Sequence, residues 1–125
     1  IEIDESGNVN VVDYKTGKIK SRNEIEGKTK SSNGDYKRQL IFYKILLDNY
    51  EKGRFKMLSG EIEFLEPDEK GNYRREKFFV TDEEVNELKE LIKKVCAEIF
   101  SFSFWDKTCG DKECEWCALA ESIRN

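Results

Sequence analysis

Hydrophobic and polar positions near the start of the chain follow the two-residue period of a strand. Residues Asn8 to Tyr14 are rich in valine and follow the turn signal around Ser6-Gly7-Asn8, which predicts a strand joined by a hairpin to an earlier one at Ile1-Glu2-Ile3. Residues 16–35 carry glycine, serine, asparagine and lysine without a sustained period. We expect them to form a long loop, of a length that is usually functional or mobile.

The period changes to that of a helix over Tyr36 to Tyr50. Apolar residues recur there at three- and four-residue spacing, which predicts an amphipathic helix with an N-cap at Asp35 and an end near Gly53. Its apolar face would comprise the following residues: Leu40, Ile41, Tyr43, Ile45 and Leu47. A helix between strands favours an α/β rather than an all-β fold.

The second half of the chain predicts two more strands and a longer helix. Arg54 to Glu66 alternates, and after a polar turn Tyr73 to Val80 forms a second strand, antiparallel to the first. Thr81-Asp82-Glu83-Glu84 is a capping box that opens a helix. The apolar face of this helix comprises six residues: Val85, Leu88, Leu91, Ile92, Val95 and Ile99. Phe100, Phe102 and Phe104 then alternate, which indicates a short strand or extended segment, and a last helical stretch starts at Ala118.

These elements predict an α/β (α+β) fold with a mixed central sheet flanked by helices. A length of 125 residues suits one domain, with a core over residues 1–100 and a cysteine-containing tail over residues 101–125. The alternating Ile1-Glu2-Ile3 opens without an entry segment, which indicates a fragment cut from a larger protein.

Composition excludes some classes of protein. The hydrophobic fraction is 38% and the aromatic fraction 12%, enough to build a core. The sequence has no apolar run of about 18 residues and no charged-then-apolar leader, so we expect a cytoplasmic protein rather than a membrane or secreted one.

Charge is unevenly distributed along the chain. The net charge is −4, yet Lys15 to Arg38 holds eight basic residues against three acids. This stretch could bind phosphodiesters, or it could be a run of solvated lysines, which charge alone favours. On the first interpretation the DNA-binding residues are Lys18, Lys20, Arg22, Lys28, Lys30 and Arg38.

Two short motifs carry the candidate chemistry. Residues i and i+2 of a strand project to one side, so Asp13 and Lys15 would lie together, beside the Tyr14 carbonyl. Gln39 and Tyr43 are four apart and share one face of the predicted helix. Phosphodiester hydrolysis uses a carboxylate-bound divalent cation and a positive charge near the transition state. Each pair alone is common, but the two in this order are more specific.

The string Val11-Val12-Asp13-Tyr14-Lys15-Thr16-Gly17, followed by a basic loop and Arg38-Gln39-Leu40-Ile41-Phe42-Tyr43, resembles the PD-(D/E)xK nuclease superfamily. More narrowly, it is similar to the RecB-type nuclease domains of repair helicases and related exonucleases. The resemblance covers residues 1 to 117 and implies a restriction-endonuclease-like core that is truncated at its N-terminus.

The resemblance also implies roles for the motif residues. Asp13 and the Tyr14 carbonyl would bind Mg or Mn, Lys15 would stabilise charge or position water, and Gln39 and Tyr43 would complete the catalytic set. A further Asp of the family lies about 14 residues before Asp13, just upstream of Ile1, so we expect the chain to lack it.

Glu2 and Asp4 are the nearest substitutes for this missing acid. Either could be a displaced metal ligand, but hairpin-rim residues in water are the favoured interpretation.

Three of the four cysteines cluster near the end of the chain, at Cys109, Cys114 and Cys117. The two-residue gap in Cys114-Glu-Trp-Cys117 is typical of zinc or iron–sulfur ligation. Some RecB-type nucleases hold an iron–sulfur cluster, but their last cysteine would fall at Ser122 or Ile123 here.

The fourth cysteine, Cys96, could complete such a set. Its place on the apolar face of a predicted helix favours a buried core cysteine instead. A remnant site that packs as a small hydrophobic cluster under Trp105 and Trp116 is therefore favoured over bound metal.

Three functions stay open. The first is the Mg-dependent, exonuclease-type DNase domain of a DNA repair and recombination helicase-nuclease, with DNA and helicase motor domains as partners and weak or no activity in this piece alone. The second is an inactive nuclease-fold module that binds DNA or a helicase. The third, a small zinc-dependent interaction domain, would leave Asp13 to Tyr43 unexplained.

Overall fold

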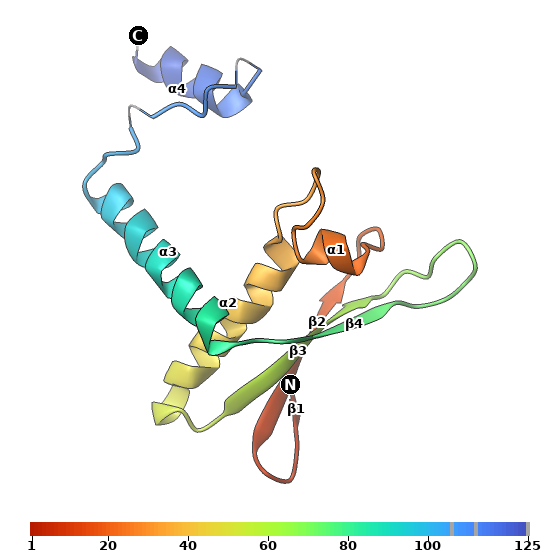
Figure 1. The fold of residues 1–125 in the computed structure, drawn as a ribbon. Coiled ribbons are helices and arrows are strands. Elements are labelled where there is room, and N and C mark those ends of the chain that lie inside the picture. The colour runs from red at the N-terminus through yellow and green to blue at the C-terminus, as the bar shows by residue number, and fades with distance from the viewer. Residues whose placement is uncertain (106, 112, 125) are drawn as a thin grey trace. The chain divides into compact units, whose positions relative to one another are not determined.

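The computed structural model describes residues 1–105, 107–111 and 113–124. The chain separates into two compact units, Ile1–Glu90 and Leu91–Asn125. The boundary falls within the long helix α3 (Asp82–Phe100), earlier than the division after residue 100 expected from the sequence. All the described strands belong to the first unit (Figure 1).

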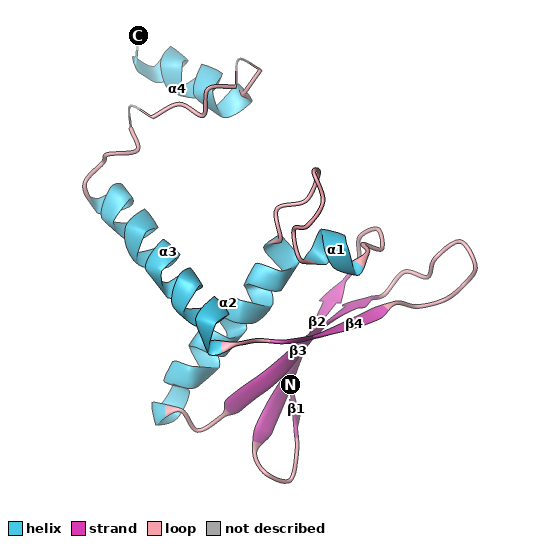
Figure 2. Ribbon diagram, in the orientation of Figure 1, coloured by secondary structure: helices cyan, strands magenta, loops and turns pink. Residues whose placement is uncertain are grey.

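The described strands form one four-stranded sheet in the order β1 (Glu2–Ile3), β2 (Asn8–Lys15), β3 (Lys56–Phe64) and β4 (Arg75–Phe79). The two outer pairs, β1 with β2 and β3 with β4, are antiparallel, whereas β2 and β3 are parallel (Figure 2). A parallel pair requires a long crossover, and helix α2 lies within it. The predicted mixed sheet with flanking helices is therefore confirmed.

Helix α2 (Asp35–Asn49) packs against β3 and β2 and buries Leu40 completely. Four further apolar residues of the predicted face pack against the core: Ile41, Tyr43, Ile45 and Leu47. The 3₁₀ turn η1 (Tyr50–Lys52) and Gly53, at a φ of +80°, end the helix where the sequence predicts. The core beneath the helix comprises ten buried residues: Val9, Val11, Ile25, Leu40, Met57, Ile62, Phe64, Phe78, Val80 and Val85.

Gly60 of β3 lets the helix and the sheet approach each other closely. A Cβ atom at this position would lie 2.8 Å from Cδ2 of Leu40 and 3.1 Å from Cε of Met57. These separations are shorter than ordinary carbon–carbon contacts, so a side chain at this position would require Leu40 and Met57 to move.

The other face of the sheet is polar. Glu61 is buried there, and one of its carboxylate oxygens lies 3.1 Å from Nζ of Lys77 and accepts a 2.9 Å bond from the Asn10 amide. Arg75 forms a second ion pair with the same carboxylate. A buried charge is tolerated when it is paired in this way.

The loop predicted over residues 16–35 contains a helix, so that prediction is wrong in part. Helix α1 (Arg22–Ile25) starts with a capping box: the Ser21 backbone N–H donates to Glu24, and the Glu24 backbone N–H donates to the Ser21 hydroxyl. Ile25 is buried in the core. Ser-x-x-Glu is a helix-start signal, but a single helical turn has too few residues to show a period.

The N-cap predicted at Asp35 is also wrong. Helix α2 begins at Asp35 itself, and Gly34 occupies the cap position with a φ of +73°. Asp35 instead forms an ion pair with Arg38 within the first turn, where a carboxylate also complements the helix dipole.

Helix α3 opens with the predicted capping box, in which the Thr81 backbone N–H donates to Glu84 at 2.9 Å. Val85 and Leu88 are buried, but Leu91, Val95 and Ile99 are about half exposed. Among the described residues, the buried part of this apolar face is therefore Val85 and Leu88, in the first two turns. Cys96 is exposed, so its prediction as a buried core cysteine is wrong.

The remaining described residues contain turns and one further helix. Phe100 ends α3 and Phe102 has a φ of +54°, so the predicted extended segment is wrong. Helix α4 (Glu115–Arg124) starts before the predicted Ala118. In the described part of the chain, no helix combines the length and apolar character needed to cross a bilayer.

Candidate active site

Asp13 and Lys15 lie at the C-terminal end of β2, on the face whose earlier residues, Val9 and Val11, enter the core. The Lys15 ammonium lies 3.1 Å from Oδ1 and 3.2 Å from Oδ2 of Asp13. Their side chains are 16% and 11% exposed, so the pair is largely shielded from water but open at one edge. The two-residue period of the strand therefore brings these residues together as predicted.

Gln39 and Tyr43 reach the same pair from α2. The Lys15 ammonium donates to Oε1 of Gln39 at 2.5 Å, and the Tyr43 hydroxyl donates to Oδ2 of Asp13 at 3.1 Å. Two motifs separated by the whole basic loop thus form one hydrogen-bonded group. Spacing predicted each pair and the family resemblance implied that the two pairs belong to one site; their catalytic role stays a prediction.

Burial and the neighbouring Asp13 carboxylate raise the pKa of the Tyr43 hydroxyl above its ordinary value. Both effects disfavour the phenolate, because it would be a second negative charge in a poorly solvated place. Tyr43 therefore acts as a hydrogen-bond donor to Asp13 at neutral pH and not as a base.

A fifth residue of the group, Tyr36, was missed from the sequence. Its ring centroid lies 4.5 Å from Nζ of Lys15 and 4.1 Å from Nζ of Lys20. The signal that could have found it is helical spacing. Tyr36 is three positions before Gln39 and seven before Tyr43, so the three side chains share one face of the helix.

The donors at this site suit a hard divalent cation. Mg²⁺ is often held by one or two carboxylates, with waters and substrate phosphates completing the set, and Asp13 with the Tyr14 carbonyl supplies oxygens of this kind. Among the described residues, however, Asp13 belongs to no group of three or more metal-ligating side chains. Protein oxygens beyond these two would have to come from elsewhere.

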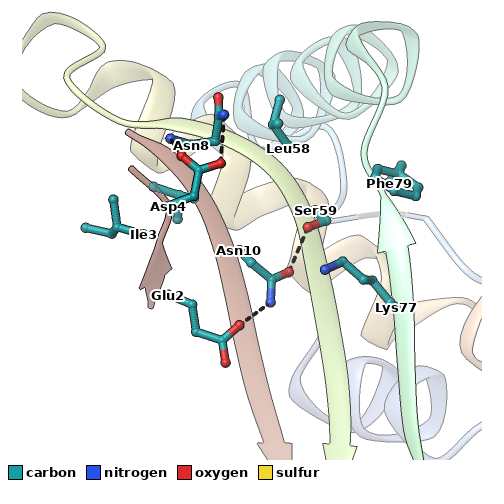
Figure 3. Close-up of a pocket in the computed structure, with 10 residues that line it drawn as sticks. Glu2, Ile3, Asp4, Asn8, Asn10, Leu58, Ser59, Lys77 and Phe79 are labelled. Atoms are coloured by element: carbon teal, nitrogen blue, oxygen red, sulfur yellow. Dashed lines mark hydrogen bonds between the residues drawn. The ribbon is translucent and has the colours of Figure 1, made fainter. Parts of the chain in front are cut away.

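Glu2 and Asp4 do not reach Asp13. Glu2 pairs with Asn10 across the β1–β2 ladder and accepts a 2.7 Å bond from its amide, while Asp4 accepts bonds from the Asn8 backbone and side chain (Figure 3). Hydrogen bonds from Asn8 hold the pKa of Asp4 below its ordinary value. Both acids line a hollow of about 400 Å³ near the start of β2, as expected for residues of the hairpin rim.

The six basic residues proposed to bind DNA fall into two groups. Three of them are held by ion pairs within the protein: Arg22 with Glu76, Lys28 with Glu26, and Arg38 with Asp35. The ammonium groups of the other three form no ion pair with any described carboxylate: Lys18, Lys20 and Lys30. The second group is therefore the better placed to contact phosphates.

The second unit contains the cysteine cluster. The sulfur atoms of Cys109, Cys114 and Cys117 all lie within 4.8 Å of one another. A hydrogen bond from the Asp111 backbone, together with the adjacent thiols, lowers the pKa of Cys109. Cys109 is exposed and Trp116 is 78% exposed, so the expected enclosure by a hydrophobic cluster is wrong.

Comparison with known families gives one match. The model of the PD-(D/E)XK nuclease superfamily matches residues 1–122, which include both motifs, the sheet and the cysteine cluster. Neither the curated proteins nor the solved structures give a match. With nearly the whole length matched and the Asp13–Lys15 and Gln39–Tyr43 pairs assembled as described, the chain belongs to the PD-(D/E)XK nuclease superfamily.

Proposed function

We propose that the group of Asp13, Lys15, Gln39 and Tyr43 is the phosphodiester-cleaving centre of a Mg²⁺- or Mn²⁺-dependent DNase. The observation that carries this proposal is the direct bonding between the two motifs, in which Lys15 donates to Gln39 and Tyr43 donates to Asp13. A lysine–carboxylate pair that is largely shielded from water, at the end of a strand, is the kind of arrangement found at functional sites.

Each residue has a defined task in this proposal. Asp13 and the Tyr14 carbonyl would hold the cation, which would polarise the phosphate and make the attacking water more acidic. Lys15 neutralises charge that develops on the phosphate oxygens, and Gln39 holds its ammonium in position. Tyr43 fixes the orientation of the Asp13 carboxylate through its hydrogen bond.

The register of β1 and β2 gives the position that would lie opposite Asp13 if the ladder continued. Glu2 faces Asn10 and Ile3 faces Val9, so each step back along β1 corresponds to one step forward along β2. Asp13 is three positions beyond Asn10, so its antiparallel partner would be three positions before Glu2. The family resemblance puts its further Asp at that same position, so we propose that the preceding residues of the natural protein supply it.

DNA binding would come from the loop between β2 and α2. Lys18, Lys20 and Lys30 have the ammonium groups best placed to contact phosphates, while Arg22, Lys28 and Arg38 would contribute after exchanging their ion-pair partners. Similarity to RecB-type domains extends the proposal to an exonuclease-type module that works with helicase motor domains in DNA repair and recombination, in the cytoplasm.

The test of this function is digestion of labelled single-stranded and duplex DNA by a chain extended to include its natural preceding residues. We expect cleavage with Mg²⁺ or Mn²⁺, and a decrease of about 100-fold or more in Asp13→Asn or Lys15→Met. Glu66→Gln, which removes an exposed acid outside the site, is the matched control and should cleave normally. Full activity in Asp13→Asn and Lys15→Met would show that the site is assigned wrongly.

A second candidate is a module that binds DNA or a helicase without cutting. It is favoured by the position of Asp13 outside any described group of three metal-ligating side chains. The same experiment separates the two functions. Binding of DNA by the extended chain, with no cleavage in either metal, supports the second.

The cysteine cluster supports a separate proposal of bound metal. Iron–sulfur clusters usually take four thiolates, whereas zinc accepts three with a carboxylate or water. Among the described residues the metal-ligating group holds three thiols and no carboxylate, so zinc with water in the fourth position fits it better than a cluster that needs four thiolates. Metal analysis and absorption spectra of anaerobically purified protein test this: one zinc and no colour supports zinc, brown absorbance supports a cluster, and a folded, metal-free sample supports neither.

A further inference from the structure

Tyr36 lies in the first turn of α2 and is partly buried. Its ring centroid is 6.4 Å from that of Phe64, which is fully buried in β3, so the ring is fixed against the core. The ammonium groups of Lys15 and Lys20 both lie close to this one ring, at 4.5 Å and 4.1 Å from its centroid.

The two lysines differ in what else they contact. An ammonium group has three donors, and that of Lys15 contacts Asp13, Gln39 and the Tyr36 ring. For Lys20, the ring is the one close contact seen among the described residues. Hydrogen bonds from Ser21 and, to a smaller extent, the charge of Lys20 lower the pKa of Glu24. The Glu24 carboxylate accepts these hydrogen bonds from Ser21.

Two ammonium groups at one ring repel each other, and the negative face of the ring offsets part of that repulsion. Without the ring, the basic loop would have little reason to keep Lys20 near Lys15. With it, Lys20 of the basic loop shares a ring contact with Lys15 of the Asp13–Lys15 pair.

We propose that Tyr36 is a positioning residue of the site, whose ring holds Lys20 next to Lys15 so that Lys20 contacts a phosphate of the bound strand. This inference rests on the proposed function, because that function supplies the phosphodiester. Tyr36 itself need not touch the substrate.

The competing explanation is that Tyr36 only fills space against Phe64. Tyr36→Phe keeps the ring face, whereas Tyr36→Leu keeps an apolar side chain and removes the ring. A positioning role therefore predicts rescue by phenylalanine alone. Lys20→Met removes the cation and leaves the core contact intact.

The first measurement concerns the free 125-residue chain and needs no DNA. Protons above an aromatic ring resonate upfield, so the Hε signals of Lys15 and Lys20 should be shifted upfield in the natural chain and in Tyr36→Phe, and both should lose this shift in Tyr36→Leu. Tyr50→Leu, which removes a ring that stacks on Phe55, is the matched control and should change neither signal. Unshifted Hε signals of Lys20 in the natural chain would overturn the proposal.

The second measurement is the salt dependence of binding to a fluorescein-labelled single-stranded oligonucleotide without metal. Removal of one cation that neutralises a phosphate lowers the slope of log affinity against log salt by about 0.7. We expect this decrease in Lys20→Met, in Tyr36→Leu and in the double variant, with no further decrease, and a natural slope in Tyr36→Phe. Equal slopes for Tyr36→Leu and Tyr36→Phe, or no change in Lys20→Met, would overturn the proposal.

The two measurements also distinguish this proposal from the function on which it rests. If the natural chain binds no oligonucleotide at low salt, DNA binding fails and phosphate contact by Lys20 fails with it, even where the Hε shifts show both lysines at the ring. If the chain binds normally and the shifts are absent, only the role of Tyr36 is wrong. Should Tyr36→Leu unfold, the Hε shift of Lys20 in the natural chain and the salt slope of Lys20→Met still decide the outcome.

Discussion

The Tyr43 hydroxyl donates a 3.1 Å hydrogen bond to Oδ2 of Asp13, which joins a helix to the end of a strand that lies thirty positions earlier in the chain. The Lys15 ammonium lies close to both oxygens of the same carboxylate. Asp13 is thus held by two side chains whose own positions are set by the sheet and by α2. Its orientation is fixed before any substrate arrives.

Replacing Tyr43 with phenylalanine should cost stability in a pH-dependent way. The raised pKa of Tyr43 means that the folded chain binds the phenolic proton more tightly than the unfolded chain does. Its contribution is fully present below the unfolded value near 10 and is lost as pH rises through the higher folded value. We expect the natural chain to exceed Tyr43→Phe by about 0.5–1.5 kcal/mol at neutral pH and to lose this advantage at higher pH.

Urea unfolding from pH 7 to pH 11 measures this difference. Tyr14→Phe, which alters an exposed phenol next to Asp13, is the control and should change little. A constant difference between natural chain and Tyr43→Phe across the whole range would contradict the assigned cause.

Asp13 and Lys15 should show strong energetic coupling. Removing either partner leaves the other as a poorly solvated charge, so Asp13→Asn and Lys15→Met should each lower the free energy of unfolding by about 1–3 kcal/mol. The double variant should lose less than the sum, because no unpaired charge remains. Urea titrations of the four chains complete the cycle, and simple additivity would show that the ion pair contributes nothing.

Lys15→Met should have opposite effects on metal binding and on cleavage. The Lys15 ammonium competes with a divalent cation for the Asp13 carboxylate, so its removal should strengthen Mn²⁺ binding while it abolishes cleavage by the extended chain. Calorimetric titration with Mn²⁺ measures the first effect. Lys15→Arg, which keeps the charge, is the control, and weaker Mn²⁺ binding in Lys15→Met would contradict this account.

Gly60→Ala should destabilise the fold. The added methyl group would meet Leu40 and Met57 at 2.8 Å and 3.1 Å, and overpacking of this kind costs about 1–3 kcal/mol. Leu40→Val in the same chain should recover part of the loss by making room. Thermal and urea unfolding of the natural chain and the two variants would reveal the effect, and an unchanged Gly60→Ala would show that Leu40 and Met57 can move without cost.

The two groups of basic residues should differ in their effect on DNA binding. A variant with alanine at Lys18, Lys20 and Lys30 should lower the salt slope for single-stranded DNA by about 0.7 for each phosphate that is no longer neutralised. A matched variant at Arg22, Lys28 and Arg38 should have less effect, since these cations are already neutralised by acids. Equal effects would mean that the ion pairs open on binding.

Much of the first unit could be predicted from the sequence because its periods are regular. The strand that carries Asp13 buries every second residue, and the helix that carries Gln39 buries residues at three- and four-residue spacing. These periods predict on which face of each element the candidate site residues lie. Helix α1 was missed because one turn has no measurable period. Its capping box was the available signal, but the composition of the surrounding residues indicated a loop.

The second unit was harder to predict because its apolar residues are not buried by described neighbours. Cys96 shares the apolar stripe of α3, yet it is exposed, since the pattern shows which face is apolar and not whether anything covers it. Tyr36 was not predicted as a site residue for a different reason. Aromatic side chains at helical spacing are most simply core residues, and only the positions of two lysines from distant segments give this one another role.

The parallel pairing of β2 with β3 has a consequence for how the site comes into being. Both motifs have been synthesised once Tyr43 is added to the chain, but α2 packs chiefly on β3, which follows it in the chain. A nascent chain that ends before residue 56 would therefore carry every residue of the candidate site without the surface that brings them together. The candidate site therefore assembles only after β3 has been translated, and it is not formed on a shorter nascent chain.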